Sequence, residues 1–227
     1  FQTQTLKAFG LEEDSAEVVP AGFLLDYLEK TTNSKIPHIN SIRIYSDSEY
    51  LIMYDSSRRN LEITENMRDG SSQFSLFSCV NFTKTAMGSR LLRNWLLFPL
   101  TNLNQIENRQ TSISSFYDNR PLLEKTKNDL GLILDVERLA GRIAMEKAHA
   151  KDLQALRASL EAWCRVKDYL NQYDFSFVSS ENSYTIIDLI KNSILDDPAT
   201  SLTDGGIIKR GWSSELDHWC SIHDNFN

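Results

Sequence analysis

The stretch TKTAMGSRLLRNWLLFPL, residues 83–100, constrains the fold more than any other part of the chain. Its apolar residues recur three and four positions apart, which places them on one face of an α-helix. Thr85 can accept hydrogen bonds from the free N–H groups of the first turn, and Pro99 cannot continue the helix. Gly88 disfavours a helix, so we expect another backbone to approach it closely. The pattern predicts about four helical turns with a wide apolar face, made of Met87, Leu91, Leu92, Trp95, Leu96 and Phe98.

The composition is that of an ordinary globular chain. It has 227 residues, of which 41% are hydrophobic and 24% charged, enough to bury a core in one or two domains. No apolar run approaches the length needed to cross a bilayer, and the N-terminus lacks the basic and then apolar order of a signal peptide. We therefore expect a cytoplasmic protein. Because the chain starts at Phe1 and stops at Asn227 without start or closing signals, we expect a piece of a longer protein.

The net charge argues against an independent nucleic-acid-binding domain. The chain carries a formal charge of −7 and has a pI near 5.2, whereas phosphate contacts need clustered Lys and Arg. Residues 57–98 hold six basic and three acidic side chains, while residues 171–227 hold three basic and nine acidic ones. Different solvated faces of one fold explain this asymmetry better than a dedicated DNA patch.

Helical patterns dominate the chain from Ala21 onward. A long amphipathic segment beginning at Asp152 carries an apolar seam of Leu153, Leu156, Leu160 and Trp163, extended by Leu170. Residues 184–195 form another segment, with Ile187, Ile190 and Ile194 on one face, and a last helix starts at Ser213 or Ser214. Two β-branched and aromatic segments flank a polar turn near the N-terminus. The sequence predicts a mainly α fold, a multi-helix core with one small β-hairpin at about residues 41–54.

Cysteine and histidine residues were weighed as metal ligands. Cys79, Cys164 and Cys220 lie far apart, with neither CxxC spacing nor the density of a disulfide scaffold, so we expect reduced and mostly buried thiols. His218, Cys220 and His223 could be ligands, but His218 and Cys220 are two positions apart and point to different sides of a helix. Core or surface histidines are therefore the expected reading, and no metal is predicted.

No catalytic arrangement is recognisable in the sequence. There is no GxxxxGK[ST] phosphate-binding loop, and the pair Gly205-Gly206 has no lysine at the required offset and reads as a turn. Asp196 and Asp197 could imitate paired catalytic carboxylates, but Pro198 follows directly and favours a helix end or solvated turn. We therefore predict a non-catalytic segment that binds no cofactor of its own.

Residues 83–100 resemble the core, or lever, domain of the MutS family of DNA mismatch-repair proteins. The family pattern is a threonine, a small residue or Met with Gly, an Arg, paired leucines, and Trp-Leu before Pro-Leu. The residues that match it are Thr83, Thr85, Met87, Gly88, Arg90, Leu91, Leu92, Trp95, Leu96, Pro99 and Leu100.

Further blocks resemble the same family in the same order. RRNLEIT is similar to a short family segment that follows the hairpin, through Arg58, Arg59, Asn60, Leu61 and Glu62. LTDGGIIKRGWSSELD is similar to the lead-in to the clamp arm, through Asp204, Gly205, Gly206, Gly211, Glu215, Leu216 and Asp217. LDVERLAGRI and KDLQALRASL resemble the paired lever-helix segments between them. Two departures are Cys79-Val80-Asn81, where relatives commonly carry aspartate, and Ala150, where a proline often precedes the lever helix.

The resemblance implies a mechanical role in a longer protein. In the family, lever helices join a C-terminal ATPase to a clamp around duplex DNA, so the parent is expected to be a DNA-dependent ATPase that uses ATP and Mg²⁺. Its expected partners are the rest of its own chain, duplex DNA through other domains, a second MutS-type subunit and a MutL-like repair ATPase, with no membrane. A bacterial-type cytoplasmic, nucleoid-associated location is implied.

The resemblance also suggests a division of the chain. Residues 1–20 are expected to be a linker from a preceding connector domain, residues 21–201 the core or lever domain, and residues 202–227 the turn and first helix leading to the clamp. The alternative is a helical protein-interaction module unrelated to repair, for which amphipathic helices alone would suffice. Whether the parent reads mismatches or belongs to another MutS branch is left open, because the mismatch-reading residues lie upstream in the family.

Overall fold

The computed structural model describes residues 16–32, 50–173, 175, 181–201, 203 and 205–226. These residues form a mainly α-helical fold, as the apolar spacing predicts. A short 3-10 helix, η3 (Asn171–Tyr173), follows the longest α-helix. The α-helices are α1 (Val18–Thr32), α2 (Asp55–Asn60), α3 (Leu76–Val80), α4 (Ala86–Leu97), α5 (Leu103–Asp118), α6 (Arg120–Leu130), α7 (Val136–Ala144), α8 (Ala150–Leu170), α9 (Glu181–Ser193) and α10 (Ser214–Phe226).

The structure does not show the hairpin predicted at about residues 41–54. Residues 33–49 lie outside the described part of the chain, and residues 51–54 form no strand. Tyr50 instead makes an isolated antiparallel bridge with Leu100, beside a 2.8 Å hydrogen bond from the Leu51 N–H to the Pro99 carbonyl. This extended segment therefore lies against the chain that leaves α4.

Side-chain caps set the starts of three consecutive helices. Thr85, Asn102 and Asn119 each accept the backbone N–H of the residue three positions further on, over 3.0, 3.2 and 3.1 Å. These bonds satisfy donors that have no partner within the helix. Pro121 lies in the first turn of α6, where its fixed φ suits the helix. The predicted start of α4 at Thr85 is confirmed.

The core lies among α6, α7, α8 and α9, and α8 packs against the other three. One buried cluster joins α6 to the C-terminal half of α8 and consists of Leu122, Val166, Tyr169 and Leu170. A second joins α7 and the N-terminal half of α8 to α9 and the residue after it, and consists of Leu139, Leu156, Ile190 and Ile194. Ile187 is also buried, so the predicted inward face of α9 is confirmed.

The predicted seam along α8 is only partly buried. Leu156 is buried, whereas Leu153, Leu160 and Trp163 pack at the edges of the two clusters. The most deeply buried positions include Ser159 and Ala162, both with no exposed surface. Small side chains let neighbouring backbone come close, so α8 packs partly through positions that an apolar count does not single out.

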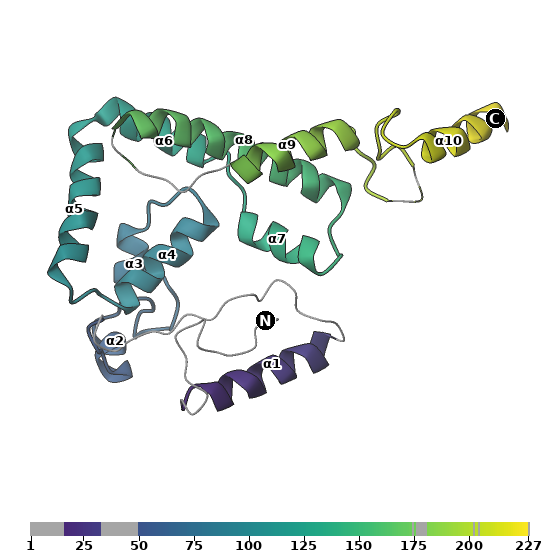
Figure 1. Ribbon diagram of the computed structural model, residues 1–227. Coiled ribbons are helices and arrows are strands. Elements are labelled where there is room, and N and C mark those ends of the chain that lie inside the picture. Colours follow the sequence, from purple (N-terminus) through teal and green to yellow (C-terminus); the bar gives the residue numbers. More distant parts are fainter. Residues whose placement is uncertain are drawn as a thin grey trace.

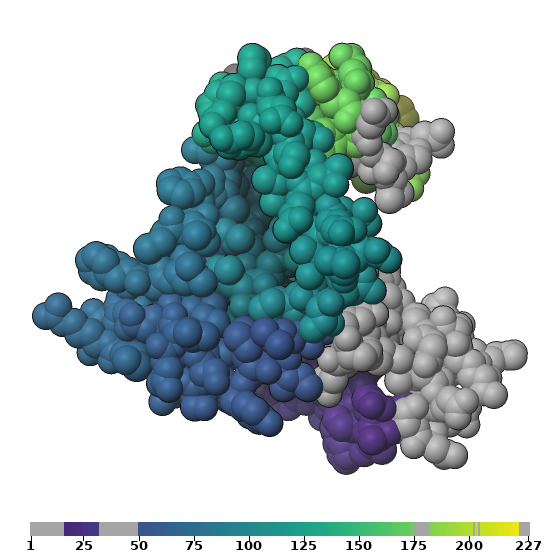
Figure 2. All heavy atoms as spheres, turned by 90° about the vertical axis from the view of Figure 1, so that its left-hand side faces the viewer, coloured from purple at the N-terminus to yellow at the C-terminus, as the bar shows by residue number. Residues whose placement is uncertain are grey.

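Figure 1 shows α6, α8 and α9 in one row that continues into α10 at the C-terminal end of the chain. Helix α7 lies below this row, and α5 runs down from α6 towards α3 and α4. In Figure 2, α5 stands as a column in front, with α6 above it and the blue residues of α2 to α4 below. Between residues 50 and 201, the described helices thus fall into an α2–α4 unit and an α6–α9 unit, with α5 between them.

The apolar face of α4 is only partly covered by the described residues. No residue of α4 is buried, and the side chains of Leu91 and Trp95 are 51% and 39% exposed. The helix that packs most closely on it, α3, has only five residues. The pattern correctly predicts the helix and its apolar side, but periodicity carries no information about which partner covers that side.

The core of α8 can be tested by truncating one buried leucine. We expect Leu156→Ala to lower the free energy of unfolding by about 2–5 kcal/mol, because Leu156 is 9% exposed and its loss leaves a cavity between α7 and α9. Urea unfolding of the wild-type and variant chains measures the difference. Leu189→Ala on α9 is the matched control, since Leu189 is 53% exposed. Equal losses for both variants would contradict this packing.

Candidate functional site

The first turn of α4 explains its glycine. A Cβ built on Gly88 would lie 2.9 Å from the Thr85 hydroxyl oxygen and 3.6 Å from the Thr83 Cβ. The Gly88 N–H donates to the same Thr85 hydroxyl over 3.0 Å. The expected approach of another helix backbone is therefore wrong: glycine leaves room for the side chain that caps its own helix. Larger residues at position 88 would push against the cap.

The other signature residues of α4 lie on different sides of the helix. Leu92 and Leu96 are partly buried, and Pro99 follows the helix as its stop. Trp95 is half-exposed, and the guanidinium of Arg109 from α5 lies 3.9 Å from its ring centroid. This cation–π contact joins α5 to α4.

The segment Arg58 to Glu62 forms the end of α2 and the turn after it. The Arg58 guanidinium lies 5.1 Å from the Phe98 ring centroid, which connects α2 to the end of α4. Arg59, Asn60 and Leu61 are exposed. Glu62 has a φ of 48°, and its carboxylate accepts the Met67 N–H over 2.6 Å. This segment therefore shapes a turn and presents no cluster of aligned functional groups.

Asn66 organises the following loop and was not singled out from the sequence. It is 9% exposed, and its side-chain carbonyl accepts the N–H groups of Arg68 and Asp69, both over 2.9 Å. Its amide donates to the Ser71 hydroxyl over 3.1 Å and to the Gln73 carbonyl over 2.8 Å. The available signal was an Asn three positions before Asp69-Gly70, since Asn and Asp side chains bond nearby backbone in turns.

The Arg90 clasp, made of Arg90, Asp135 and Glu137, joins α4 to the start of α7. Two guanidinium nitrogens of Arg90 donate to the two carboxylate oxygens of Asp135 over 2.9 and 2.7 Å. The Nε donates to Glu137 over 3.1 Å, and a terminal nitrogen also reaches the same oxygen. Asp135 caps α7 as well, because it accepts the Arg138 N–H over 3.3 Å. Two blocks that are 45 residues apart in sequence thus meet through charge.

The clasp changes the acidity of its members. Hydrogen bonds from Arg90 hold the pKa of Asp135 below its usual value, and the hydrogen bonds to Asp135 and Glu137 raise the pKa of Arg90. Charge-assisted bidentate pairs of this kind favour the ionised form of both partners. Arg90 and Asp135 are therefore both charged at neutral pH.

The turn that leads to α10 uses glycine where the backbone requires it. Gly205, Gly206 and Gly211 have φ values of 67°, 63° and 86°, a region that other residues rarely adopt, so the predicted turn at Gly205-Gly206 is confirmed. Asp204 lies outside the described residues. Ile208 then pairs with Ile194 at the end of α9.

Asp217 connects α10 back to the lead-in, residues 205–213, which precedes it. Its carboxylate accepts the Gly211 N–H over 2.8 Å, and its backbone carbonyl lies 3.4 Å from the Arg210 guanidinium. Ser213 caps the helix by accepting the Leu216 N–H, and Glu215 in the first turn is exposed. The predicted start at Ser213 or Ser214 is confirmed, and the carboxylate fixes the angle between the lead-in and α10.

A second charged group, the C-terminal junction, consists of Arg157, Asp196 and Lys209. The Arg157 guanidinium donates to Asp196 over 3.0 Å, and the Lys209 Nζ lies 3.8 Å from the same oxygen. The hydrogen bond from Arg157 is the main cause that lowers the pKa of Asp196. In addition, Gln154 donates to the Leu195 carbonyl over 2.6 Å. Asp196 is therefore an ion-pair partner that fastens the lead-in to α8, and not half of a paired-carboxylate site.

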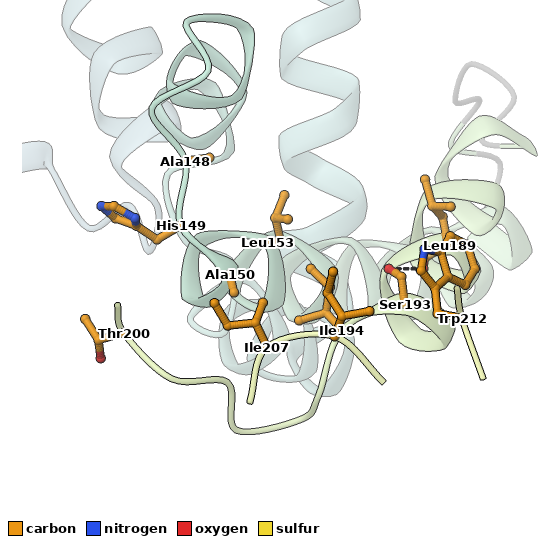
Figure 3. A pocket seen from close by; sticks show the side chains of 11 residues that line it. Ala148, His149, Ala150, Leu153, Leu189, Ser193, Ile194, Thr200, Ile207 and Trp212 are labelled. Atoms are coloured by element: carbon orange, nitrogen blue, oxygen red, sulfur yellow. Dashed lines mark hydrogen bonds between the residues drawn. The ribbon is translucent and has the colours of Figure 1, made fainter. Parts of the chain in front are cut away.

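An apolar pocket of about 430 Å³ lies beside this junction. Figure 3 shows Leu153 from α8, Ile194 and Ile207 in the central part of its lining, with Leu189 and Trp212 on one side. The side chains of Leu189 and Trp212 are 53% and 48% exposed. The place where α9 meets the lead-in to α10 therefore presents uncovered apolar surface.

The described residues provide no metal site and no membrane span. Over residues 50–173 and the other described ranges, no three His, Cys, Asp or Glu side chains lie close enough to hold a metal ion. The side chain of His223 is not described. Cys164 is buried, but Cys79 is exposed and Cys220 is partly exposed, so the prediction of mostly buried thiols is wrong. None of the described helices is both long and apolar enough to cross a bilayer.

Basic side chains of the segment 57–98 are partly neutralised within the fold. Arg58 lies 3.5 Å from Asp55, Arg93 lies 3.6 Å from Glu65, and Arg90 belongs to the clasp. Carboxylates so close to these guanidinium groups reduce the positive potential available to a phosphate backbone.

These features define the class of the protein: a helical scaffold whose charged side chains connect one helix to the next. The family profile of MutS domain III matches residues 56–226. The chain belongs to the MutS domain III family and is the core, or lever, domain of a MutS protein.

Relatives agree with this assignment. The DNA mismatch repair protein MutS of Treponema denticola is 42% identical over 230 residues, which cover 99% of this chain and 26% of that protein. The proteins of the same name from Treponema pallidum (strain Nichols) and Methanosarcina barkeri are each 36% identical, over 100% and 99% of this chain and 26% of theirs. The chain therefore spans about a quarter of the length of these curated relatives.

The C-terminal junction can be tested by titration. We expect Arg157→Gln to raise the pKa of Asp196 towards its ordinary value, because the strongest hydrogen bond to the carboxylate is lost. Since the folded pKa is depressed, the pair stabilises the fold above the unfolded value of about 3.9, and this contribution disappears as the pH falls through the folded pKa. NMR titration of the Asp196 carboxyl measures the shift. Arg93→Gln is the control and should leave it unchanged; an unchanged pKa in Arg157→Gln would refute the pairing.

Proposed function

We propose that the chain is a non-catalytic lever that couples a DNA clamp to a distant ATPase domain in a MutS-type protein. The observation that carries the proposal is the row of α6, α8 and α9 continuing into α10 (Figure 1). Helix α8 has 21 residues and is therefore about 31 Å long by its rise per residue. A row of packed helices of this length moves as a unit, so a small rotation at one end becomes a displacement at the other.

The C-terminal junction supports a mechanical connection between the row and α10. Arg157 on α8 holds Asp196 after α9, and Lys209 before α10 approaches the same carboxylate. The Lys209 N–H also donates to the Ser193 carbonyl over 2.8 Å. These bonds fix the lead-in to the end of the row, so a movement of the row is passed to α10.

The whole protein's partners follow from the same proposal. Its relatives are named DNA mismatch repair proteins, so we propose that the parent binds duplex DNA through other domains and hydrolyses ATP with Mg²⁺. A second MutS-type subunit and a MutL-like ATPase are its further proposed partners, in a cytoplasmic protein that acts at the nucleoid. The alternative of a helical module unrelated to repair loses its support, because the family match extends over residues 56–226.

We propose the same division of the chain that the resemblance implies. Residues 1–20 would be a linker, residues 21–201 the lever domain, and residues 202–227 the lead-in and first helix of the clamp arm. In this division the signature residues have structural tasks: Gly88 accommodates a cap, Arg90 makes the clasp, and Asp217 holds α10. The uncovered apolar faces of α4 and of the pocket suit contact with the rest of a longer chain.

Coupling can be tested in the complete protein that contains this chain. We expect the double variant Arg157→Gln with Lys209→Gln to keep ATP hydrolysis and DNA binding, but to lose most of the effect that mismatched duplex has on the hydrolysis rate. That effect is a coupling free energy, typically about 1–3 kcal/mol between two sites. Steady-state hydrolysis with and without mismatched duplex measures it.

The control for coupling is Arg93→Gln, which breaks an exposed pair on the far unit of the fold. It should leave the stimulation by mismatched duplex unchanged. If mismatched duplex changes the hydrolysis rate of the double variant as much as that of the wild type, the lever proposal is contradicted. Loss of DNA binding itself would instead assign these residues to the DNA interface.

Direct DNA binding by the chain alone is expected to be weak. The acidic net charge opposes contact with a phosphate backbone, and Arg58, Arg90 and Arg93 are already paired with carboxylates within the fold. Fluorescence anisotropy with mismatched and matched duplexes at low and moderate salt measures the affinity. Tight binding with a steep salt dependence would show that the chain is a DNA-binding domain in its own right.

A further inference from the structure

We propose that the Arg90 clasp is a releasable latch that sets the orientation of the α2–α4 unit relative to the α6–α9 unit. The proposal concerns a conformational device within this chain and does not depend on the lever function. With the clasp closed, the two units hold one arrangement. With the clasp open, they swing about α5.

The clasp is a second connection between α4 and α7, in addition to the chain that joins them through α5 and α6. Helix α5 packs on α6, and Arg109 in its N-terminal half lies over Trp95 of α4. From α4 the chain runs through α5 and α6 to α7, and Arg90 then joins α4 directly to the start of α7. A connected series of helices closed by a second attachment has a defined geometry, whereas one attachment leaves a hinge.

Among the described residues, no buried apolar cluster holds the α2–α4 unit against the α6–α9 unit. The two buried clusters among the described residues are built from α6, α8 and the residues around α7 and α9, and neither contains a residue of α2, α3 or α4. Helix α4 has no buried residue. The orientation of the α2–α4 unit therefore relies on charged and cation–π contacts, which are individually weaker than a buried core.

The exposure of the clasp makes it releasable. The side chains of Arg90 and Glu137 are 49% and 67% exposed, while Asp135 is 19% exposed. Salt screens charges that solvent can reach, and a carboxylate outside the clasp can compete for Arg90. The bidentate bond to Asp135 still gives the closed state a single geometry, because both oxygens are aligned with the guanidinium.

Distances between spin labels in the whole 227-residue chain test the latch. Cys79 on α3 is exposed and takes one label, and Ala158→Cys on the exposed side of α8 takes the other, with Cys220→Ser to remove the remaining accessible thiol. We expect one narrow distance distribution at low salt. In Arg90→Glu the narrow peak should be lost and replaced by a broad distribution. An unchanged distribution in Arg90→Glu would overturn the proposal.

Two variants separate the latch from local folding. Arg93→Glu places the same charge change on the same helix, but Arg93 pairs with Glu65 inside the α2–α4 unit, so its narrow peak should persist. Asp135→Asn removes the charge and keeps a residue able to cap α7, so it should broaden the peak without loss of helix content by circular dichroism. Broadening in Arg93→Glu equal to that in Arg90→Glu would show a general charge effect and refute the latch.

Salt screening and charge reversal provide two further tests of the clasp. Raising the salt concentration should broaden the distance distribution of the labelled chain with an intact clasp. In the double variant Arg90→Glu with Glu137→Arg, part of the narrow distribution lost in Arg90→Glu should return. A peak that stays narrow at molar salt would contradict a releasable clasp. Because neither DNA nor nucleotide is present, these outcomes are independent of the coupling experiment.

Discussion

The close packing of α8 is the constraint on which the rest of the structure depends. Ser159 and Ala162 have no exposed surface, and larger side chains at these positions would separate α8 from its neighbours. Ser159 also accepts the Leu134 N–H over 3.1 Å, just before the Asp135 cap of α7. One small polar residue thus positions the chain at the point where the clasp forms.

Two kinds of contact divide the molecule. Within the α6–α9 unit, apolar side chains such as Leu156 and Val166 are removed from water and keep the helices in fixed register. At the borders of that unit, the clasp and the C-terminal junction use charged groups that remain accessible to solvent. Buried apolar contacts give rigidity and exposed ion pairs give adjustable connections.

Particular residues show which features follow from the local sequence and which depend on the folded structure. Thr85, Pro99 and Gly205 were predicted correctly because a cap, a helix stop and a turn are local requirements. Gly88 was misread, because its neighbour is the side chain of its own cap. Asn66 was missed, since its four hydrogen bonds appear only when the loop closes around it.

The sequence by itself determined the helices, the capped or proline-marked ends such as those of α4, and the family, because these depend on residue spacing and on short motifs read within a few turns. Only the tertiary structure decided that Arg90 meets Asp135, that Arg157 meets Asp196, and that small residues carry the contact of α8. Such pairs join positions tens of residues apart. Their distance follows from the packing of whole helices, which local spacing does not contain.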